Sequence, residues 1–166
     1  MPLTRCNSCY QYNVQLAPRV VNQLAKQQFE LSNNAPEGVK FYQNPDGDIT
    51  DIQADIYGPG KLLATSFSLV VGTPYEGGTF RCRIVLQDNF PANPPKGYFL
   101  TKIFHPNVAQ PSGDICVNTL KKDWNPAKWN LGHILEVIKC LLIVPFPESS
   151  LNEEAGRQFM EDYQQY

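Results

Sequence analysis

The stretch FRCRIVLQ, residues 80–87, alternates apolar and polar side chains with a period of two. Phe80, Cys82, Ile84 and Leu86 fall on one side of it, and the other side is mostly polar. This alternation is typical of a β-strand that turns one face to a hydrophobic core and the other to solvent. The stretch therefore predicts a half-buried strand in the middle of a sheet.

Three further segments have strand character on either side of residues 80–87. They cover residues 39–42, 52–56 and 97–102. Turn-forming residues separate them, because Asn, Pro, Asp and Gly fill positions 44–48, and Gly77-Gly78 precedes the central strand. Strands that follow one another through turns favour an antiparallel meander of four strands.

Helical patterns frame these strands. After Pro18, apolar side chains recur on one face of a helix that ends near residues 33–36. A second apolar stripe covers residues 131–142 and is stopped by two prolines, and Asn152 can cap a third helix. The order helix, strands, loop, helices predicts an α+β fold. We expect residues 1–13 to be a loose arm and residues 14–166 to form one domain.

Composition restricts the class of protein. The chain has 166 residues, is 42% hydrophobic and carries a formal net charge of −2, so it can bury a core but lacks the basic character of a nucleic-acid binder. It contains no apolar run of the length needed to cross a membrane and no signal-peptide core at its start. We therefore expect no nucleic-acid or membrane partner and a cytoplasmic or nuclear location.

The five cysteines are too irregularly spaced to suggest a disulfide framework. Cys82 lies on the apolar side of the central strand and Cys140 lies among apolar residues of the second helix, so packing is expected for both. Cys6 and Cys9 have Cys-x-x-Cys spacing, but a zinc site needs four ligands and no second pair exists. We expect no metal at these cysteines.

A long loop before the second helix holds Cys116, and loops of this length usually carry function. It contains His105-Pro106-Asn107, Ile115-Cys116 and Trp124-Asn125-Pro126, and the proline-rich segment 91–95 precedes it. These four pieces, in this order and at these spacings, resemble the ubiquitin-conjugating enzyme family over roughly residues 14–166. Segments 94–99, 116–124 and 147–156 are most similar to its S-type subfamily, which extends ubiquitin chains with the anaphase-promoting complex.

The resemblance implies an enzyme that accepts ubiquitin as a thioester on Cys116 and transfers it to a lysine amine. A thiolate suits both steps, because it is a good nucleophile and a good leaving group. The implied partners are ubiquitin, its activating enzyme and a ubiquitin ligase, with the anaphase-promoting complex as one candidate. No cofactor is expected, since ATP is consumed by the activating enzyme.

The resemblance also assigns roles around the thiol. Asn107 is the candidate to stabilise the anionic intermediate, while His105, Pro106, Trp124 and Ser149 are expected to support the loop. Many relatives carry an acid where this chain has Ser149, so no general base for the incoming amine is secured.

Two surfaces are assigned in the same way. Glu153, Arg157 and Glu161, which a spacing of four places on one helical face, are expected to orient the acceptor ubiquitin. The residues expected to contact a ligase are Ala92, Pro126 and Ala127. A solvated helix with salt bridges would show the same charge pattern on residues 153–161.

Ala92 stands where many relatives carry an aromatic or bulky contact for a ligase, and the sequence departs from the family in three further places. Residues 61–71, KLLATSFSLVV, interrupt a normally tight hairpin and are interpreted as a partner-binding extension or a retained short intron. One extra residue near 110–112 should bulge the loop between Asn107 and Cys116. The family's last helix and the S-type basic tail would follow Tyr166, so a shortened or divergent form is one interpretation.

Other functions stay open. A catalytically impaired ubiquitin-binding variant of the same fold would share most of these residues but normally lacks the cysteine. An enzyme for another ubiquitin-like protein would have the same site. An unrelated thiol hydrolase would need a histidine base, and neither histidine is evidently placed for that role.

Overall fold

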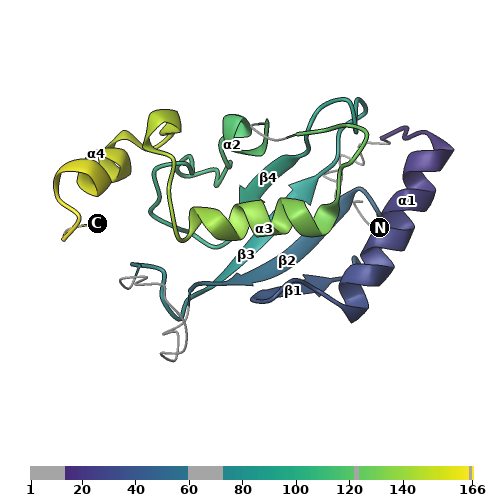
Figure 1. Cartoon of the computed structure of the whole chain (residues 1–166), viewed down its shortest axis with the longest axis horizontal. Coiled ribbons are helices and arrows are strands. Elements are labelled where there is room, and N and C mark those ends of the chain that lie inside the picture. Colours follow the sequence, from purple (N-terminus) through teal and green to yellow (C-terminus); the bar gives the residue numbers. More distant parts are fainter. Residues whose placement is uncertain (1–13, 60–72, 122–123, 165) are drawn as a thin grey trace, which may run out of the picture.

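The computed structural model describes residues 14–59, 73–121, 124–164 and 166. Nine elements follow one another in them: α1 Pro18–Asn33, β1 Val39–Tyr42, β2 Asp51–Tyr57, β3 Thr79–Val85, β4 Lys96–Phe99, α2 Val117–Lys121, α3 Leu131–Leu141, the 3₁₀ turn η1 Pro147–Ser149 and α4 Glu153–Glu161. The expected α+β order of an N-terminal helix, four strands and C-terminal helices is confirmed (Figure 1). None of the described helices is long and apolar enough to cross a membrane.

The four strands form an antiparallel sheet in the order β1-β2-β3-β4, which confirms the predicted meander. On its inner face, Ile52, Ala54, Cys82 and Ile84 are fully or almost fully buried. On the other face, Arg81 pairs with Asp55 directly across β2 and β3, at 2.6 Å. Alternate side chains of residues 80–87 thus point to the core and to the charged outer face of the sheet.

Two helices cover the sheet. In Figure 1, α3 crosses the inner face of the sheet and α1 lies beyond β1, in contact with both α3 and β1. The α3 stripe of Leu131, Ile134, Leu135 and Ile138 packs onto the inner sheet face as one core. The loop that carries the site runs from β4 to α3, and its Ile103, Val108 and Ile115 belong to the same core.

Two predicted boundaries were wrong. The fourth strand ends at Phe99 instead of residue 102, because the N–H groups of Leu100 and Thr101 both turn to the Arg81 carbonyl, and the ladder stops there. The segment after Cys116, predicted as loop, contains the five-residue helix α2. A single short turn of helix has no amphipathic period to reveal it.

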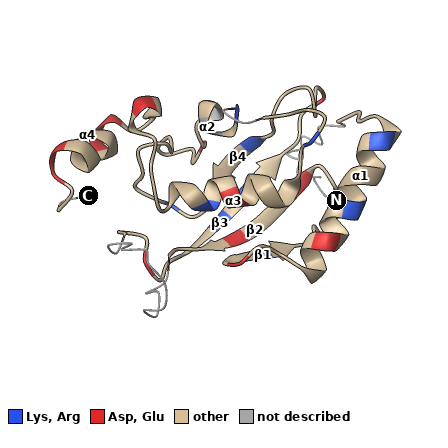
Figure 2. Cartoon of the chain, viewed as in Figure 1, with Lys and Arg blue, Asp and Glu red and all other residues tan. Residues whose placement is uncertain are grey.

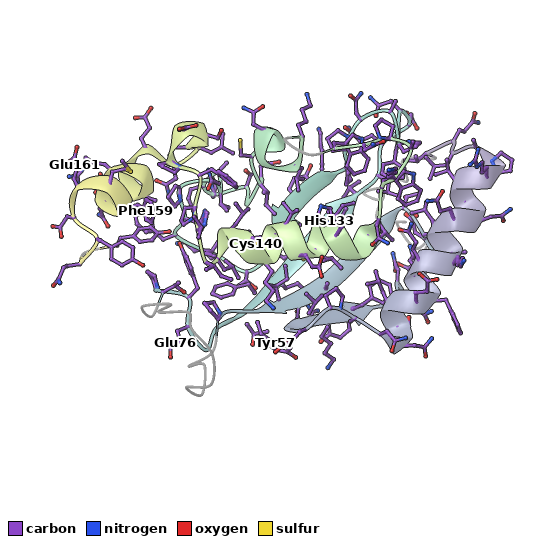
Figure 3. All side chains as sticks on the ribbon, in the orientation of Figure 1. Tyr57, Glu76, His133, Cys140, Phe159 and Glu161 are labelled. Atoms are coloured by element: carbon purple, nitrogen blue, oxygen red, sulfur yellow. The ribbon has the colours of Figure 1, made fainter. Side chains whose placement is uncertain are left out.

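Cys140 was predicted to pack and is instead exposed. The buried positions of α3 include Ile138 and Leu141, and a residue two positions after Ile138 points about 200° away from it around a helix. Cys140 therefore lies on the outer face of α3, where Figure 3 labels it. Cys82, by contrast, is completely buried, as predicted.

Both the 1–13 arm and the 61–71 insertion lie outside the described residues. The strands that hold the insertion are well defined, because Tyr57 pairs with Thr79 and the Gly58 N–H donates to the Gly78 carbonyl at 2.9 Å. The described residues on either side of the insertion therefore continue the pairing of β2 with β3.

Candidate active site

A small hairpin joins the two residues on which the predicted chemistry depends. Val108 bridges Ile115, and the Cys116 N–H donates to the Asn107 carbonyl at 3.0 Å. Residues 110–112, where the sequence analysis expects one extra residue, lie in the turn beyond this pairing, where Gly113 adopts φ +77° and its N–H bonds the Ala109 carbonyl. Residues 110–112 thus lie at the tip of the hairpin, and its pairing keeps Asn107 beside Cys116.

Cys116 lies at the end of this hairpin, immediately before α2, and is 6% exposed. Little of its surface is therefore open to solvent. The other described cysteines are unlike it: burial raises the pKa of the Cys82 thiol to about 12, and Cys140 lies exposed on α3. Of these three thiols, only Cys116 is both held in the hydrogen-bonded hairpin and slightly exposed to solvent.

The Asn107 side chain is fully engaged within the protein. Its amide nitrogen donates to the carbonyls of Phe146, at 2.6 Å, and Ser149, at 3.0 Å, and its oxygen accepts the Phe146 N–H at 2.8 Å. The residue is completely buried. In this arrangement Asn107 holds residues 146–149 against the hairpin that carries Cys116.

His105 has a structural place. It is fully buried, its Nε2 lies 2.9 Å from the Leu141 carbonyl, and its Nδ1 accepts the Asn107 N–H at 3.0 Å. Burial lowers the pKa of His105 to about 4, so the ring is neutral at pH 7. Neither nitrogen is free to take a proton from a thiol or an amine.

The carbonyl of Pro106 fixes the start of α4 beside the thiol hairpin. It accepts the N–H groups of Leu151 and Asn152, at 2.7 and 3.0 Å, and the hydroxyl of Ser150 at 3.3 Å. Asn152 then caps α4 by accepting the Ala155 N–H at 3.1 Å. The His-Pro-Asn turn therefore positions both the thiol and the first turn of α4.

Ser149 ends η1 and is half-buried, and its carbonyl is held by Asn107. Glu148, beside it, is exposed. Acidic residues gather on η1 and α4 (Figure 2). Ser149 thus lies next to the site, as its predicted supporting role requires. The same short segment exposes the Glu148 carboxylate to solvent.

The three α4 residues predicted to orient an acceptor are exposed. Arg157 contacts Glu161 at 3.7 Å, and it also pairs at 2.7 Å with Glu154, which the sequence analysis did not select. In Figure 3, Phe159 lies toward the body of the molecule and Glu161 lies on the outer side. The outer side of α4 is therefore a charged, solvent-facing surface, on a helix whose start is held by the Pro106 carbonyl.

The predicted ligase surface comes from two loops that the structure ties together. The Trp124 indole N–H donates to the Pro91 carbonyl at 2.9 Å. Ala92, Pro126 and Ala127 are all exposed. The hydrogen bond brings the proline-rich segment 91–95 beside residues 124–127, as a shared surface requires.

One buried polar residue escaped the sequence analysis. Gln27 is 8% exposed and bonds backbone groups of Trp129 and Leu131. Its spacing was the available signal, because it lies three residues after Leu24 and four before Leu31 and so shares their buried face. A polar side chain on that face needs a partner inside the protein.

No three histidine, cysteine or acidic side chains of the described residues come together as a metal site would require. Cys6 and Cys9 lie outside these residues.

Comparisons with known proteins agree on one family. The family model described as "Ubiquitin-conjugating enzyme" matches residues 22–166. A protein named Ubiquitin-conjugating enzyme E2 S from Branchiostoma floridae is 56% identical over 151 residues, which cover 91% of this chain and 64% of the relative. Ubiquitin-conjugating enzyme E2 22 from Arabidopsis thaliana is 53% identical over 93% of this chain and 56% of its own length.

Solved structures give the same result. The crystal structure of a putative ubiquitin conjugating enzyme from Plasmodium yoelii matches with a TM-score of 0.71 and 30% identity, covering 91% of this chain and 89% of that one. The chain spans less than two thirds of the length of the Branchiostoma and Arabidopsis relatives.

Proposed function

Because the chain belongs to the ubiquitin-conjugating enzyme family, we propose that it accepts ubiquitin as a thioester on Cys116 and passes it to a lysine amine. The observation that carries this proposal is the hairpin that frames Cys116 at 6% exposure, with its N–H on the Asn107 carbonyl at 3.0 Å. Cys82, by contrast, is completely buried within strand β3.

The two transfers balance without a cofactor. In the first, the Cys116 thiolate attacks the thioester carbon of ubiquitin on the activating enzyme; a new C–S bond forms and the activating enzyme's thiolate leaves. In the second, a lysine amine attacks the same carbon; a C–N bond forms, Cys116 leaves as thiolate, and the amine loses a proton. ATP is consumed upstream, by the activating enzyme.

Asn107 acts in this account by positioning. Both hydrogens of its amide are already donated, to the Phe146 and Ser149 carbonyls. It could donate to an oxyanion only by giving up one of these bonds, and the longer one, to Ser149 at 3.0 Å, is the more easily exchanged. Its first role is to fix residues 146–149 at the edge of the site.

The proton of the attacking amine needs an acceptor from outside the site. His105 is buried and neutral, with both ring nitrogens in hydrogen bonds. Glu148 faces solvent beside the half-buried Ser149. We infer that the acceptor protein, or water, takes the proton, and that the outer side of α4 orients the acceptor through Glu153, Arg157 and Glu161.

The finer parts of the proposal concern partners. The similarity to proteins named Ubiquitin-conjugating enzyme E2 S supports ubiquitin as the modifier, and we propose chain extension as the reaction. The surface of Ala92, Pro126 and Ala127 would meet a ligase, and the anaphase-promoting complex is the first candidate to test. We propose a cytoplasmic or nuclear location, where the cysteines stay reduced.

A charging assay tests the proposal. The protein is mixed with ubiquitin, the ubiquitin-activating enzyme and ATP, then run on a gel with and without reducing agent. We expect an adduct that reductant removes, that Cys116→Ala abolishes, and that Cys140→Ala, which removes the exposed thiol of α3, leaves unchanged. Absence of an adduct on folded protein would favour the impaired ubiquitin-binding variant, or a different ubiquitin-like modifier if one of those charges instead.

A further inference from the structure

Gln27 connects α1 to the end of the loop that precedes α3. Its side-chain nitrogen donates to the Trp129 carbonyl at 3.3 Å, and its side-chain oxygen accepts the Leu131 N–H at 2.8 Å. The residue is 8% exposed and lies between Leu24 and Leu31 on the buried face of α1. One amide therefore serves both a carbonyl of the loop and the first N–H of α3.

The loop it holds, residues 124–130, is anchored at both ends. At the front, the Trp124 indole donates to the Pro91 carbonyl at 2.9 Å. At the rear, Trp129 is held by Gln27. Phe90 lies against both tryptophan rings, with centroids 5.7 Å from Trp124 and 4.7 Å from Trp129.

The turn between these anchors carries the exposed residues of the proposed ligase surface. Asn125 closes the turn, because its side-chain oxygen accepts the Ala127 N–H at 2.9 Å and its carbonyl accepts the Lys128 N–H at 3.0 Å. Pro126 and Ala127 are exposed at its apex. A turn of this kind keeps its shape but takes its orientation from the two points that hold its ends.

We propose that Gln27 is a positioning residue for ligase-stimulated transfer: its amide fixes the rear of loop 124–130 and so sets where Pro126 and Ala127 meet a ligase. The inference rests on the proposed function, since it concerns how a ligase acts on the charged protein. A residue on the buried face of α1 would thus affect how a ligase contacts the exposed side of loop 124–130. Formation of the thioester, at Cys116, does not depend on it.

The chemistry of glutamine suits this position. An amide offers a donor to Trp129 and an acceptor to Leu131 at once. Gln27→Leu removes both and leaves a buried carbonyl and a buried N–H without that partner. Gln27→Glu, when ionised, keeps the acceptor for the Leu131 N–H, which lies at a helix N-terminus that favours a carboxylate, but loses the donor to Trp129.

The next residue of α1 supplies a matched control. Gln28 also bonds a backbone carbonyl, from its side-chain nitrogen to Ile49 at 2.8 Å, but Ile49 belongs to the turn between β1 and β2. Gln28→Leu therefore makes the same chemical change on the same helix and removes a hydrogen bond of the same kind. It leaves loop 124–130 untouched.

The experiment compares the unmodified protein, both Gln27 variants and Gln28→Leu. Each is charged with ubiquitin, and discharge to free lysine is timed alone and with the RING domain that most accelerates the unmodified protein in a purified panel. Acrylamide quenching of tryptophan fluorescence is measured in parallel; Trp124 and Trp129 are the two tryptophans of the chain, so the signal reports on this loop alone.

We expect all four proteins to charge and to discharge unaided alike. With the RING domain, both Gln27 variants should lose about fivefold to tenfold in rate, the equivalent of one to two net hydrogen bonds. Their quenching constants should rise, and Gln28→Leu should match the unmodified protein in every measurement. Full RING acceleration and unchanged quenching in Gln27→Leu, an equal loss in Gln28→Leu, or no acceleration by any RING domain would overturn the proposal.

If the unmodified protein forms no ubiquitin adduct, the proposed function fails first. The quenching comparison still tests whether Gln27 holds loop 124–130, because equal quenching in Gln27→Leu and Gln28→Leu would show that it does not.

Discussion

At the scale of single residues, Asn107 and His105 form one buried chain of hydrogen bonds behind the thiol. His105 accepts the Asn107 N–H, and the Asn107 carbonyl accepts the Cys116 N–H. The Asn107 side chain continues the chain to Phe146 and Ser149. Removing one member of such a network leaves its neighbours buried and unpaired.

Asn107→Asp tests whether this side chain braces the site. A carboxylate cannot donate to the Phe146 and Ser149 carbonyls, so we expect the free energy of unfolding to fall by about 1–3 kcal/mol. Discharge of ubiquitin from Cys116 should slow as well. Urea unfolding and a lysine-discharge assay measure the two effects, and Asn118→Asp, an exposed position on α2, is the control. Unchanged stability together with lost discharge would contradict the bracing role and favour direct contact with the oxyanion.

His105 predicts a pH dependence of stability. Burial lowers its pKa to about 4 from 6.5, so below pH 6.5 the unfolded chain takes up a proton that the folded chain resists. Stability from this group is complete above pH 6.5 and declines as the pH falls toward 4. We expect a loss of about 2 kcal/mol between pH 7 and pH 5.

The chain has two histidines, so His133→Gln isolates His105. Urea unfolding of that variant should show the same fall, since His133 is exposed on α3. A fall that disappears in His133→Gln would show that the wrong histidine has been assigned. An NMR titration in which the His105 ring gains its proton near pH 6.5 would also contradict the assignment.

At the scale of elements, the meander and the long helices could be predicted because each repeats its pattern. Strand β3 alternates over its whole length, and α3 buries Leu131, Ile134, Leu135 and Ile138 at helical spacing. The short α2 has no room for such a repeat. The roles of Gln27 and of the Pro106 carbonyl depend on partners distant in sequence, which no local pattern contains.

Helix α4 gives a prediction in which stability and function should separate. Arg157 forms exposed ion pairs with Glu154 and Glu161, and exposed pairs contribute little to stability, about 0.2–1 kcal/mol. If the outer side of α4 orients the acceptor, Arg157→Ala should slow ubiquitin transfer to free ubiquitin by about tenfold, equivalent to one lost charged contact. Charging and thermal stability should barely change.

Glu154→Gln is the matched control for that experiment. It breaks the 2.7 Å pair with Arg157 but leaves Glu153, Arg157 and Glu161 in place. Transfer to free ubiquitin should therefore stay within about twofold of the unmodified protein, as for a surface change. A loss as large as that of Arg157→Ala would mean that the ion pair, and not the outer side of α4 itself, governs the reaction.

At the scale of the whole molecule, the fold brings three distant segments to one turn. Residues 105–107 form backbone and amide hydrogen bonds to the thiol hairpin, to the Phe146–Ser149 segment and to the start of α4. The sequence motifs placed these pieces in the right family, but the hydrogen bonds that join them follow from tertiary packing. The β2–β3 connection reaches this region as well, because the Tyr75 hydroxyl donates to the Phe104 carbonyl at 2.7 Å and the Tyr75 ring lies 5.5 Å from that of His105.

Deleting residues 61–71 tests whether the domain and its site depend on the insertion. The register of β2 and β3 is set by pairs from Asp51–Val85 to Tyr57–Thr79, and Gly58 and Gly78 continue it. We expect the shortened protein to fold, with charging within about twofold of the original, as for a change outside the site. Circular dichroism and the charging gel measure these outcomes, and loss of either would show that the insertion supports the domain.

The central claim is that Cys116 carries an acyl group, and Cys116→Ser tests it most directly. Replacing sulfur by oxygen turns a thioester into an ester, which thiol reductants leave intact and hydroxide cleaves. We predict that, with ubiquitin, its activating enzyme and ATP, the unmodified protein gives an adduct lost on reduction. The Cys116→Ser protein should give a slower-forming adduct that survives reduction and disappears in alkali. An adduct on Cys116→Ser that reductant still removes would place the acyl group on another cysteine and contradict the account.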